Sequence, residues 1–311
     1  MQIIEAKLPD INLQTPSALA LGMFDGVHLG HQKVIAHAKV FAETNSLQTG
    51  VITLKKHPKE LTHRNLKEKD APLLLTNLET RFKIFQDFGI DFVLVIDFDE
   101  EFMNTSALDY LNLYLKDKLN SKFISVGYDH HFGKNRSGNI HLLETWSQEN
   151  DIELKVQEPY QIIDTVVSSS LIRQLISKGK IKEANQYLGY DFRYIAQVIH
   201  GKKQGQQLGF PTANLEIDRQ VQLPAFGVYK GYCQIENNPE MYKVAINYGV
   251  RPSIDNDDSK SLELHLIDFS GDLYGKKIDL RFTEKIRDEQ KFSNLEDLKK
   301  QIKEDIALCM N

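Results

Sequence analysis

The sequence reads GMFDGVHLGH from Gly22 to His31, between a short apolar run and a segment with helical spacing of apolar residues. The run Ala18–Leu21 stops at Gly22 and predicts a strand, and the apolar positions from Val34 to Ala42 predict a helix. A strand that leads into a helix N-terminus creates an anion site, because free backbone N–H groups and the positive end of the helix dipole point outwards. The glycines let a phosphate approach the backbone closely. The stretch therefore predicts a site for a nucleotide phosphate.

Two imidazoles, His28 and His31, occupy neighbouring positions at the start of the predicted helix. They are placed to donate hydrogen bonds to a phosphoryl group that gains charge during a reaction. Two other interpretations stay open: ordinary surface histidines beside a glycine turn, and a metal-binding pair. No cysteine and no carboxylate–histidine cluster accompanies them, which disfavours the metal site.

The ordered pattern G-x-F-D-G-x-H-x-G-H resembles the HxGH signature of nucleotidyltransferases. In its Phe-Asp-Gly form it is similar to the adenylyltransferase half of bacterial bifunctional riboflavin kinase/FMN adenylyltransferases, also called FAD synthetases. The resemblance implies that His28 and His31 are catalytic. It also implies that ATP is contacted by four residues: Gly22, Phe24, Asp25 and Gly30.

The composition is that of a globular protein, with 41% hydrophobic and 26% charged residues. The net charge of -5 disfavours a nucleic-acid binder, because no basic excess is present to neutralise a phosphate backbone. Two cysteines, Cys233 and Cys309, are too few for a disulfide framework and suit a reducing cytoplasm. No signal-peptide core or membrane-spanning apolar run is found. We expect a cytoplasmic protein with small-molecule ligands and no membrane partner, and weak self-association stays open.

The length of 311 residues allows two domains. From residue 1 to 188, short apolar runs alternate with helical stretches, which predicts a Rossmann-like α/β domain with a mostly parallel sheet. From residue 189 to 311, closely spaced runs rich in Tyr, Val and Ile predict a small antiparallel β-barrel. The expected strands are Ala18–Leu21, Val51–Leu54, Phe92–Ile96, Phe123–Val126, Ile152–Val156, Tyr194–Ile199, Gly227–Ile235, Tyr242–Ile246, Leu262–Phe269 and Lys277–Phe282.

Apolar residues at helical spacing predict the helices that connect these strands. The last predicted helix packs on the barrel and closes the chain. The expected helices are His31–Thr44, Leu78–Phe88, Ala107–Lys118, Ile140–Glu149, Ile181–Leu188 and Leu295–Leu308.

Two further segments resemble flavin-binding loops of the transferase half. The sequence GYDHHFG from Gly127 to Gly133 is similar to a Gly-x-Asp/Asn-Phe-x-Phe-Gly loop, with His130 in place of the usual Phe. The resemblance assigns Asp129 to the flavin, whereas the residues alone also fit an ordinary polar loop. His57 resembles the histidine of a Phe-x-Pro-His-Pro loop and is assigned to the flavin in the same way.

The run from Val167 to Arg173 predicts the start of a helix with serine hydroxyls as caps, and Arg173 lies one turn in from Ser169 or Ser170. Helix capping alone would explain the serines. The segment is similar to the family's Ser-Ser-Thr-x-Ile-Arg motif. That resemblance assigns Ser169, Ser170 and Arg173 to the ATP triphosphate, where a guanidinium neutralises departing pyrophosphate.

The predicted barrel carries a second motif. Its glycines do not have the order of a Walker A loop. Joined to a Pro-Thr-Ala-Asn sequence, expected to form a turn, they resemble the riboflavin kinase motif, with Gln206 in place of a common Arg. The resemblance implies that the oxygens of Thr212 and Asn214 bind Mg²⁺ carried by nucleotide phosphates. It also implies that three glycines bind ATP in the kinase: Gly201, Gly205 and Gly209.

Glu263 lies in an alternating run that places it on one strand face with His265 and Ile267. A carboxylate on a strand is more often simply solvated. The run is similar to the kinase's Glu-x-His-Leu-x-Asp-Phe strand, which implies that Glu263 is the base for the riboflavin 5′-hydroxyl. The resemblance assigns three residues to the flavin of the kinase: Asn247, Arg287 and Phe292.

The resemblance extends from Gly22 to Phe292, with the motifs in the family's order. It implies an enzyme that converts riboflavin and ATP to FMN and ADP, and then FMN and ATP to FAD and pyrophosphate, with Mg²⁺ as the cofactor. Two alternatives stay open: a monofunctional enzyme in which one half has decayed, and a flavin-binding regulatory protein. The presence of six residues together disfavours a regulatory protein, because binding alone does not need the whole set, which is His28, His31, Arg173, Thr212, Asn214 and Glu263.

Overall fold

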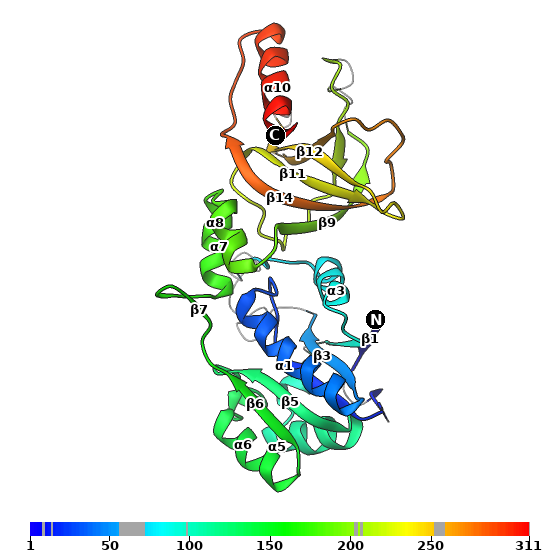
Figure 1. Cartoon of the computed structure of the whole chain (residues 1–311), viewed down its shortest axis with the longest axis vertical. Coiled ribbons are helices and arrows are strands. Elements are labelled where there is room, and N and C mark those ends of the chain that lie inside the picture. The colour runs from blue at the N-terminus through cyan, green and yellow to red at the C-terminus, as the bar shows by residue number, and fades with distance from the viewer. Residues whose placement is uncertain are drawn as a thin grey trace. The chain divides into compact units, whose positions relative to one another are not determined.

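The computed structural model divides the chain into two compact units (Figure 1). The first comprises Met1–Pro72 and Arg81–Ser168, and the second Leu73–Thr80 and Ser169–Asn311. The predicted domain boundary after residue 188 stays a prediction. The structure describes residues 1–7, 10–13, 15–55, 72–97, 99–201, 205, 208–251 and 259–310.

The first unit contains a six-stranded, fully parallel sheet in the order β1-β4-β3-β2-β5-β6. This confirms the predicted α/β fold. All five predicted strands are present, and β1 is an edge strand that the sequence analysis missed, because its residues are mostly exposed. The strands are β1 (Gln2–Ala6), β2 (Ser17–Leu21), β3 (Gln48–Leu54), β4 (Phe92–Ile96), β5 (Ser121–Gly127) and β6 (Glu153–Gln157).

Helices cover both faces of this sheet. Leu19 and Leu21 of β2 pack in one cluster with Leu111 and Trp146. The alternate residues of β2 point to the other face, where α1 contacts the strand. The predicted helix at 107–118 is a short α-helix followed by a π-helix. The helices are α1 (Leu29–Asn45), α3 (Leu78–Asp87), α4 (Glu100–Asn104), α5 (Ala107–Asp109), η3 (Tyr110–Lys118), η4 (Lys134–Arg136) and α6 (Ile140–Glu149), and a small hairpin joins β7 (Gln161–Ile162) to β8 (Thr165–Val166).

The second unit contains a closed antiparallel barrel in the order β10-β13-β12-β11-β14-β9, as predicted (Figure 1). The C-terminal helix α10 packs against β11 and β12. Among the described residues, no helix is long and apolar enough to span a membrane. The elements are α7 (Ser169–Ser177), α8 (Ile181–Leu188), β9 (Phe192–Ile199), β10 (Ala213–Leu215), β11 (Gly227–Ile235), β12 (Met241–Arg251), β13 (Ser259–Leu266), β14 (Lys277–Arg287) and α10 (Leu295–Met310).

Two local predictions for the barrel were wrong. The Pro-Thr-Ala-Asn sequence is not wholly a turn, because Ala213–Leu215 forms β10, which pairs with β13 and β9 and closes the barrel. Ala213 and Leu215 are buried, so packing prevails over the local turn preference of Pro and Asn. Ile267 does not share a strand face with Glu263, because β13 ends at Leu266 and Ile267 is buried.

Candidate functional site

The turns after β2 and β5 lie where the order of the parallel sheet reverses. The chain passes from β2 to β3 on one side of β2, and later from β4 to β5 on the other side. Ligands of open parallel sheets bind beyond the carboxyl ends of the strands at such a reversal. The turn from Gly22 to His28 and the loop from Gly127 to Phe132 both leave the sheet there. They form the candidate site of the first unit.

The turn after β2 has an unusual backbone. Phe24, Gly26 and Val27 have φ angles of 50°, 77° and 34°, in the left-handed region that residues other than glycine rarely adopt. Phe24 and Val27 are buried in the core, and Asp25 between them is also buried. Packing therefore holds the strained backbone in one conformation, and the turn is a fixed support for the histidines that follow.

Phe24 contacts His31 from the core side. The two rings meet edge to face with centroids 5.4 Å apart, and Phe85 packs on Phe24 at 6.0 Å. A Cβ on Gly22 would lie 3.1 Å from the Phe24 ring, so the glycine leaves room for this ring. The predicted ATP contacts of Gly22, Phe24 and Asp25 stay predictions.

His28 caps the N-terminus of α1. Its Nδ1 accepts a hydrogen bond from the backbone N–H of His31 at 3.3 Å, which leaves the proton of the neutral ring on Nε2. The two imidazoles stack with centroids 3.6 Å apart and 15° between their planes. A Cβ on Gly30 would lie 3.3 Å from two atoms of the His28 ring. Gly30 therefore leaves room for the His28 ring at the N-terminus of α1, and the proton of this ring is on Nε2.

Burial keeps both imidazoles neutral. It lowers the pKa of His28 to about 4, against the opposing effect of a backbone hydrogen bond. The pKa of His31 is also well below its usual value, first because of burial and then because of His28 and Arg81. At pH 7 the two rings are therefore neutral hydrogen-bond donors, and they avoid the repulsion of two stacked cations.

The lowered pKa of His28 makes the stability of the protein depend on pH. As pH falls, the unfolded chain takes up this proton near pH 6.5, but the folded protein takes it up only near pH 4. The free energy of unfolding is therefore full above pH 6.5 and falls below it, by about 2 kcal/mol from His28 between pH 7 and pH 5. Urea unfolding of the wild type and of His28→Asn at both pH values measures this. An equal pH dependence in both proteins would contradict it.

The loop after β5 places Asp129 and His131 at the surface. His131 Nδ1 lies 2.9 Å from the carbonyl of Asp129, and His130 donates its backbone N–H to Gly127. The ring of His130 stacks on Phe132, with centroids 5.7 Å apart. Its Nε2 is buried and has no hydrogen-bond partner among the described residues, and burial lowers its pKa to about 4. The ring is therefore neutral at pH 7, and the assignment of Asp129 to a flavin stays a prediction.

Three other residues assigned to the transferase lie on helix α7. Ser169, Ser170 and Arg173 belong to α7 in the second compact unit, and Arg173 Nε donates to the carbonyl of Leu73 at 2.6 Å. Their grouping with the histidines of the first unit stays a prediction. His57 lies outside the described residues.

Sequence reasoning missed Arg81, whose side chain is completely buried. Its Nη1 donates to the carbonyl of Met23 in the turn after β2, at 3.0 Å. A signal was present in the sequence: Arg81 stands three and four residues before Ile84 and Phe85, which are buried in α3. This spacing places Arg81 on the core-facing side of the helix.

The candidate kinase residues form a row across three strands of the barrel. Asn214 of β10 pairs with Glu263 of β13, which pairs with Asn247 of β12. Their strand neighbours Leu262 and Leu264 are buried inside the barrel, so the row lies on the outer face of the barrel, where Asn214 is itself buried. Thr212 Oγ1 donates to Glu263 Oε2 at 3.3 Å. The structure thus brings together four residues that the sequence assigned separately: Thr212, Asn214, Asn247 and Glu263.

Two of the motif glycines lie against this row. A Cβ on Gly201 would lie 2.2 Å from Asn214 Nδ2, and one on Gly205 would lie 3.0 Å from Thr212 Oγ1. Gly209 has a φ of 90°, which favours glycine. Because Gly201 and Gly205 have no side chains, they leave room for Asn214 and Thr212, the two residues assigned to Mg²⁺. Gln206 lies outside the described residues.

The residues of this row fit a magnesium ion. The Thr212 hydroxyl, the Asn214 amide and the nearby Glu263 carboxylate provide hard oxygen atoms, the ligand type that Mg²⁺ takes when it is carried by phosphates. The absence of side chains at Gly201 and Gly205 leaves space beside Asn214 and Thr212.

Arg287, assigned to the flavin of the kinase, is held by α10. Its guanidinium donates to both carboxylate oxygens of Asp305, at 2.7 to 3.2 Å, and Asp305 is buried. The Phe292 ring lies 5.9 Å from the guanidinium carbon. Arg287 and Phe292 thus lie next to each other, and their contact with a flavin stays a prediction.

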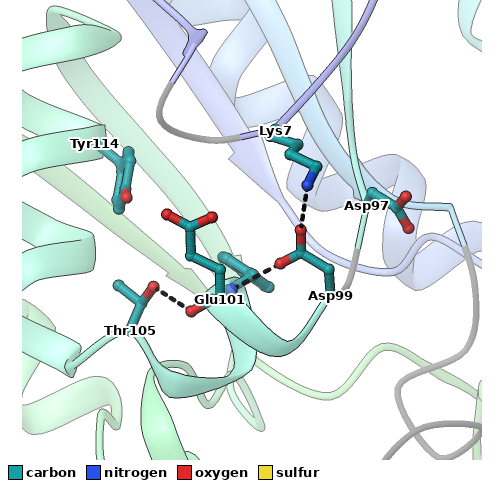
Figure 2. A pocket seen from close by; sticks show the side chains of 7 residues that line it. Lys7, Asp97, Asp99, Glu101, Thr105 and Tyr114 are labelled. Carbon is teal, nitrogen blue, oxygen red and sulfur yellow. Dashed lines mark hydrogen bonds and ion pairs between the residues drawn. The ribbon is translucent and has the colours of Figure 1, made fainter.

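A hollow that the sequence did not predict lies at the carboxyl ends of β1 and β4 (Figure 2). Its polar groups serve the local structure: Lys7 pairs with Asp99 at 3.5 Å, and Asp99 caps α4 by accepting from Phe102 N at 2.9 Å. The lining residues are Lys7, Asp97, Asp99, Glu101, Phe102, Thr105 and Tyr114.

Two family models match successive parts of the chain. The family model described as FAD synthetase matches residues 10–171, and the one described as riboflavin kinase matches residues 188–311. The bifunctional riboflavin kinase/FMN adenylyltransferase of Haemophilus influenzae is 35% identical over 289 residues, which cover 93% of this chain and 92% of that protein. The Bacillus subtilis protein of the same name is 34% identical over 298 residues, covering 94% and 91%.

A solved structure shares the fold over the whole length. The crystal structure of a protein named Macrolide-efflux Protein from Streptococcus pneumoniae matches with a TM-score of 0.87 and 29% sequence identity. The match covers 100% of this chain and 99% of that one. This likeness shows that the two proteins share a fold.

Proposed function

Because the chain belongs to the family of bifunctional riboflavin kinase/FMN adenylyltransferases, we propose that it makes FAD from riboflavin in two reactions. Riboflavin first takes the γ-phosphoryl group of ATP, which gives FMN and ADP. FMN then takes the adenylyl group of a second ATP, which gives FAD and pyrophosphate. The observation that carries this proposal is the match of both family models to successive parts of the chain.

The adenylyl transfer takes place at the turn after β2. The FMN phosphate attacks the α-phosphorus of ATP in line, and no general base is needed because a phosphate monoester is already anionic near neutral pH. The Nε2–H of His28, on a ring held by His31 N–H, donates to the phosphoryl oxygens as their charge grows. Two features support this role: the neutral state of both rings and their place at the helix N-terminus.

Riboflavin phosphorylation takes place on the outer row of the barrel. Glu263 accepts the proton of the riboflavin 5′-hydroxyl, which then attacks the γ-phosphorus of ATP. Thr212 and Asn214 would hold Mg²⁺, which neutralises charge on the nucleotide phosphates when bound. The contact between Thr212 and Glu263 supports the close placing of base and metal.

The setting of the enzyme follows from these substrates. We propose a cytoplasmic protein whose partners are riboflavin, FMN, FAD, ATP, ADP and pyrophosphate, with Mg²⁺ as the required metal and without nucleic-acid or membrane partners. The net charge of -5 supports the absence of a nucleic-acid partner.

The proposed function is tested with the purified chain, ATP and Mg²⁺. One reaction contains riboflavin and the other FMN, and the products are separated by chromatography. We expect FMN and FAD from riboflavin, and FAD from FMN. FMN alone or FAD alone would show an enzyme with one active half, and neither product would show a binding protein without turnover.

A further inference from the structure

Arg81 carries a positive charge into the core of the first unit. None of its side chain is exposed, although a buried charge is unfavourable unless its hydrogen-bonding groups are bound. Oxygen atoms that accept hydrogen bonds from its guanidinium stabilise this charge.

The guanidinium joins the ends of two neighbouring strands. Its Nη1 lies 3.0 Å from the Met23 carbonyl, 3.0 Å from Thr53 Oγ1 and 3.1 Å from the Leu54 carbonyl. The Thr53 hydroxyl in turn donates to the Met23 carbonyl at 2.8 Å. The Met23 carbonyl thus accepts from both Arg81 and Thr53, one residue beyond Gly22 at the end of β2.

This carbonyl belongs to the peptide unit that joins Met23 to Phe24. Rotation of the unit changes the φ angle of Phe24, which is held at 50° in the left-handed region. The Phe24 ring is buried and meets the edge of His31, and His31 stacks on His28. The contacts therefore run in an unbroken series from Arg81 to the two imidazoles.

We propose that Arg81 is a positioning residue for adenylyl transfer: with Thr53 it fixes the peptide before Phe24, and through Phe24 it fixes the ring of His31 against His28. This rests on the proposed function of the turn. Arg81 touches no reacting atom in this role, and its effect is on the rate of the chemical step. A misplacement of about 1 Å at a reacting group can lower a rate about 100-fold.

The charge of Arg81 has a second effect on the same histidine. It lowers the pKa of His31, after burial and His28 in importance. The charged or titratable groups that act on His31 are thus His28 from its own helix and Arg81 from α3. Removing the guanidinium should raise the pKa of His31.

The test compares four variants of the full-length enzyme. Thr53→Val keeps the shape of the residue but removes one donor to Met23, whereas Arg81→Lys and Arg81→Met remove the guanidinium. Lys83→Met is the matched control, because Lys83 lies on the same helix and makes an ion pair with Asp87 near the surface. For each variant, kcat and KM are measured for FAD formation from FMN, with riboflavin phosphorylation measured in the same preparation.

We expect kcat for FAD formation to fall about 10-fold in Thr53→Val and about 10- to 100-fold in the Arg81 variants, with KM changed less. Riboflavin phosphorylation and Lys83→Met should stay near wild type. In Arg81→Met the imidazole signals of His31 should also titrate at a higher pH by NMR than in Thr53→Val, which keeps the guanidinium charge. If Arg81→Met does not fold, Thr53→Val and Arg81→Lys decide the question.

Normal kcat in Thr53→Val and in Arg81→Lys would overturn the positioning role. So would an equal loss of both activities in the Thr53 and Arg81 variants, because a residue that positions only the adenylyl-transfer site should leave riboflavin phosphorylation near wild type. A wild type that forms no FAD would instead overturn the proposed function, so the two failures are distinguishable.

Discussion

Replacing Glu263 with glutamine is expected to slow riboflavin phosphorylation by about 10²- to 10⁴-fold, the usual contribution of a general base. Glutamine has nearly the same shape, so it keeps the place of Glu263 opposite Asn214 and Asn247 and can still accept from Thr212. It cannot take the proton of the riboflavin 5′-hydroxyl. An alcohol is a poor nucleophile until that proton leaves, so the loss should appear in kcat.

Two controls separate this effect from unfolding. FAD formation from supplied FMN should continue in Glu263→Gln. Glu284→Gln makes the same chemical change on β14 of the same barrel, where Glu284 pairs with Lys230 near the surface, and it should leave phosphorylation unchanged. Unchanged phosphorylation in Glu263→Gln would remove Glu263 from the mechanism, and an equal loss of both activities would argue against separate sites.

Prediction from the sequence is clearest for strands whose residues all face a core. The strand Phe92–Ile96 is buried at all five positions, and such a run of apolar residues has few other structures open to it. By contrast, β1 is an exposed edge strand, and β10 is only three residues long. Both are stabilised by pairing with strands distant in the chain, which no local pattern records.

In the candidate sites, too, local motifs could be predicted, whereas features that depend on residues distant in the chain could not. Motifs indicated Glu263 and Asn214 one at a time, but their pairing depends on the register between β10 and β13, which forms only when the barrel closes. The neutral state of His28 also depends on burial by the folded chain. Arg81 was missed because a charged residue in an amphipathic helix is usually exposed, and only the structure shows the carbonyl of Met23 that it binds.

Removal of the His28 imidazole should have the other large effect. In His28→Ala, we expect FAD formation from FMN to fall about 10²- to 10³-fold, the loss that follows removal of one donor to a developing oxyanion. The structure gives a reason for so large an effect. The His31 N–H fixes Nδ1 as an acceptor, so the ring offers its single proton at Nε2 in one direction and needs no reorientation during the reaction.

The matched control for His28→Ala is His37→Ala, which removes an imidazole from the same helix, where it lies 3.0 Å from the Gln157 side chain. FAD formation in His37→Ala should stay near wild type, and riboflavin phosphorylation should be normal in both variants. A role as a neutral donor further requires that the wild-type rate does not rise as pH falls from 8 to 6, because burial keeps the pKa of His28 at about 4. A rate that increased as this ring gained a proton would instead indicate catalysis by a cationic imidazolium.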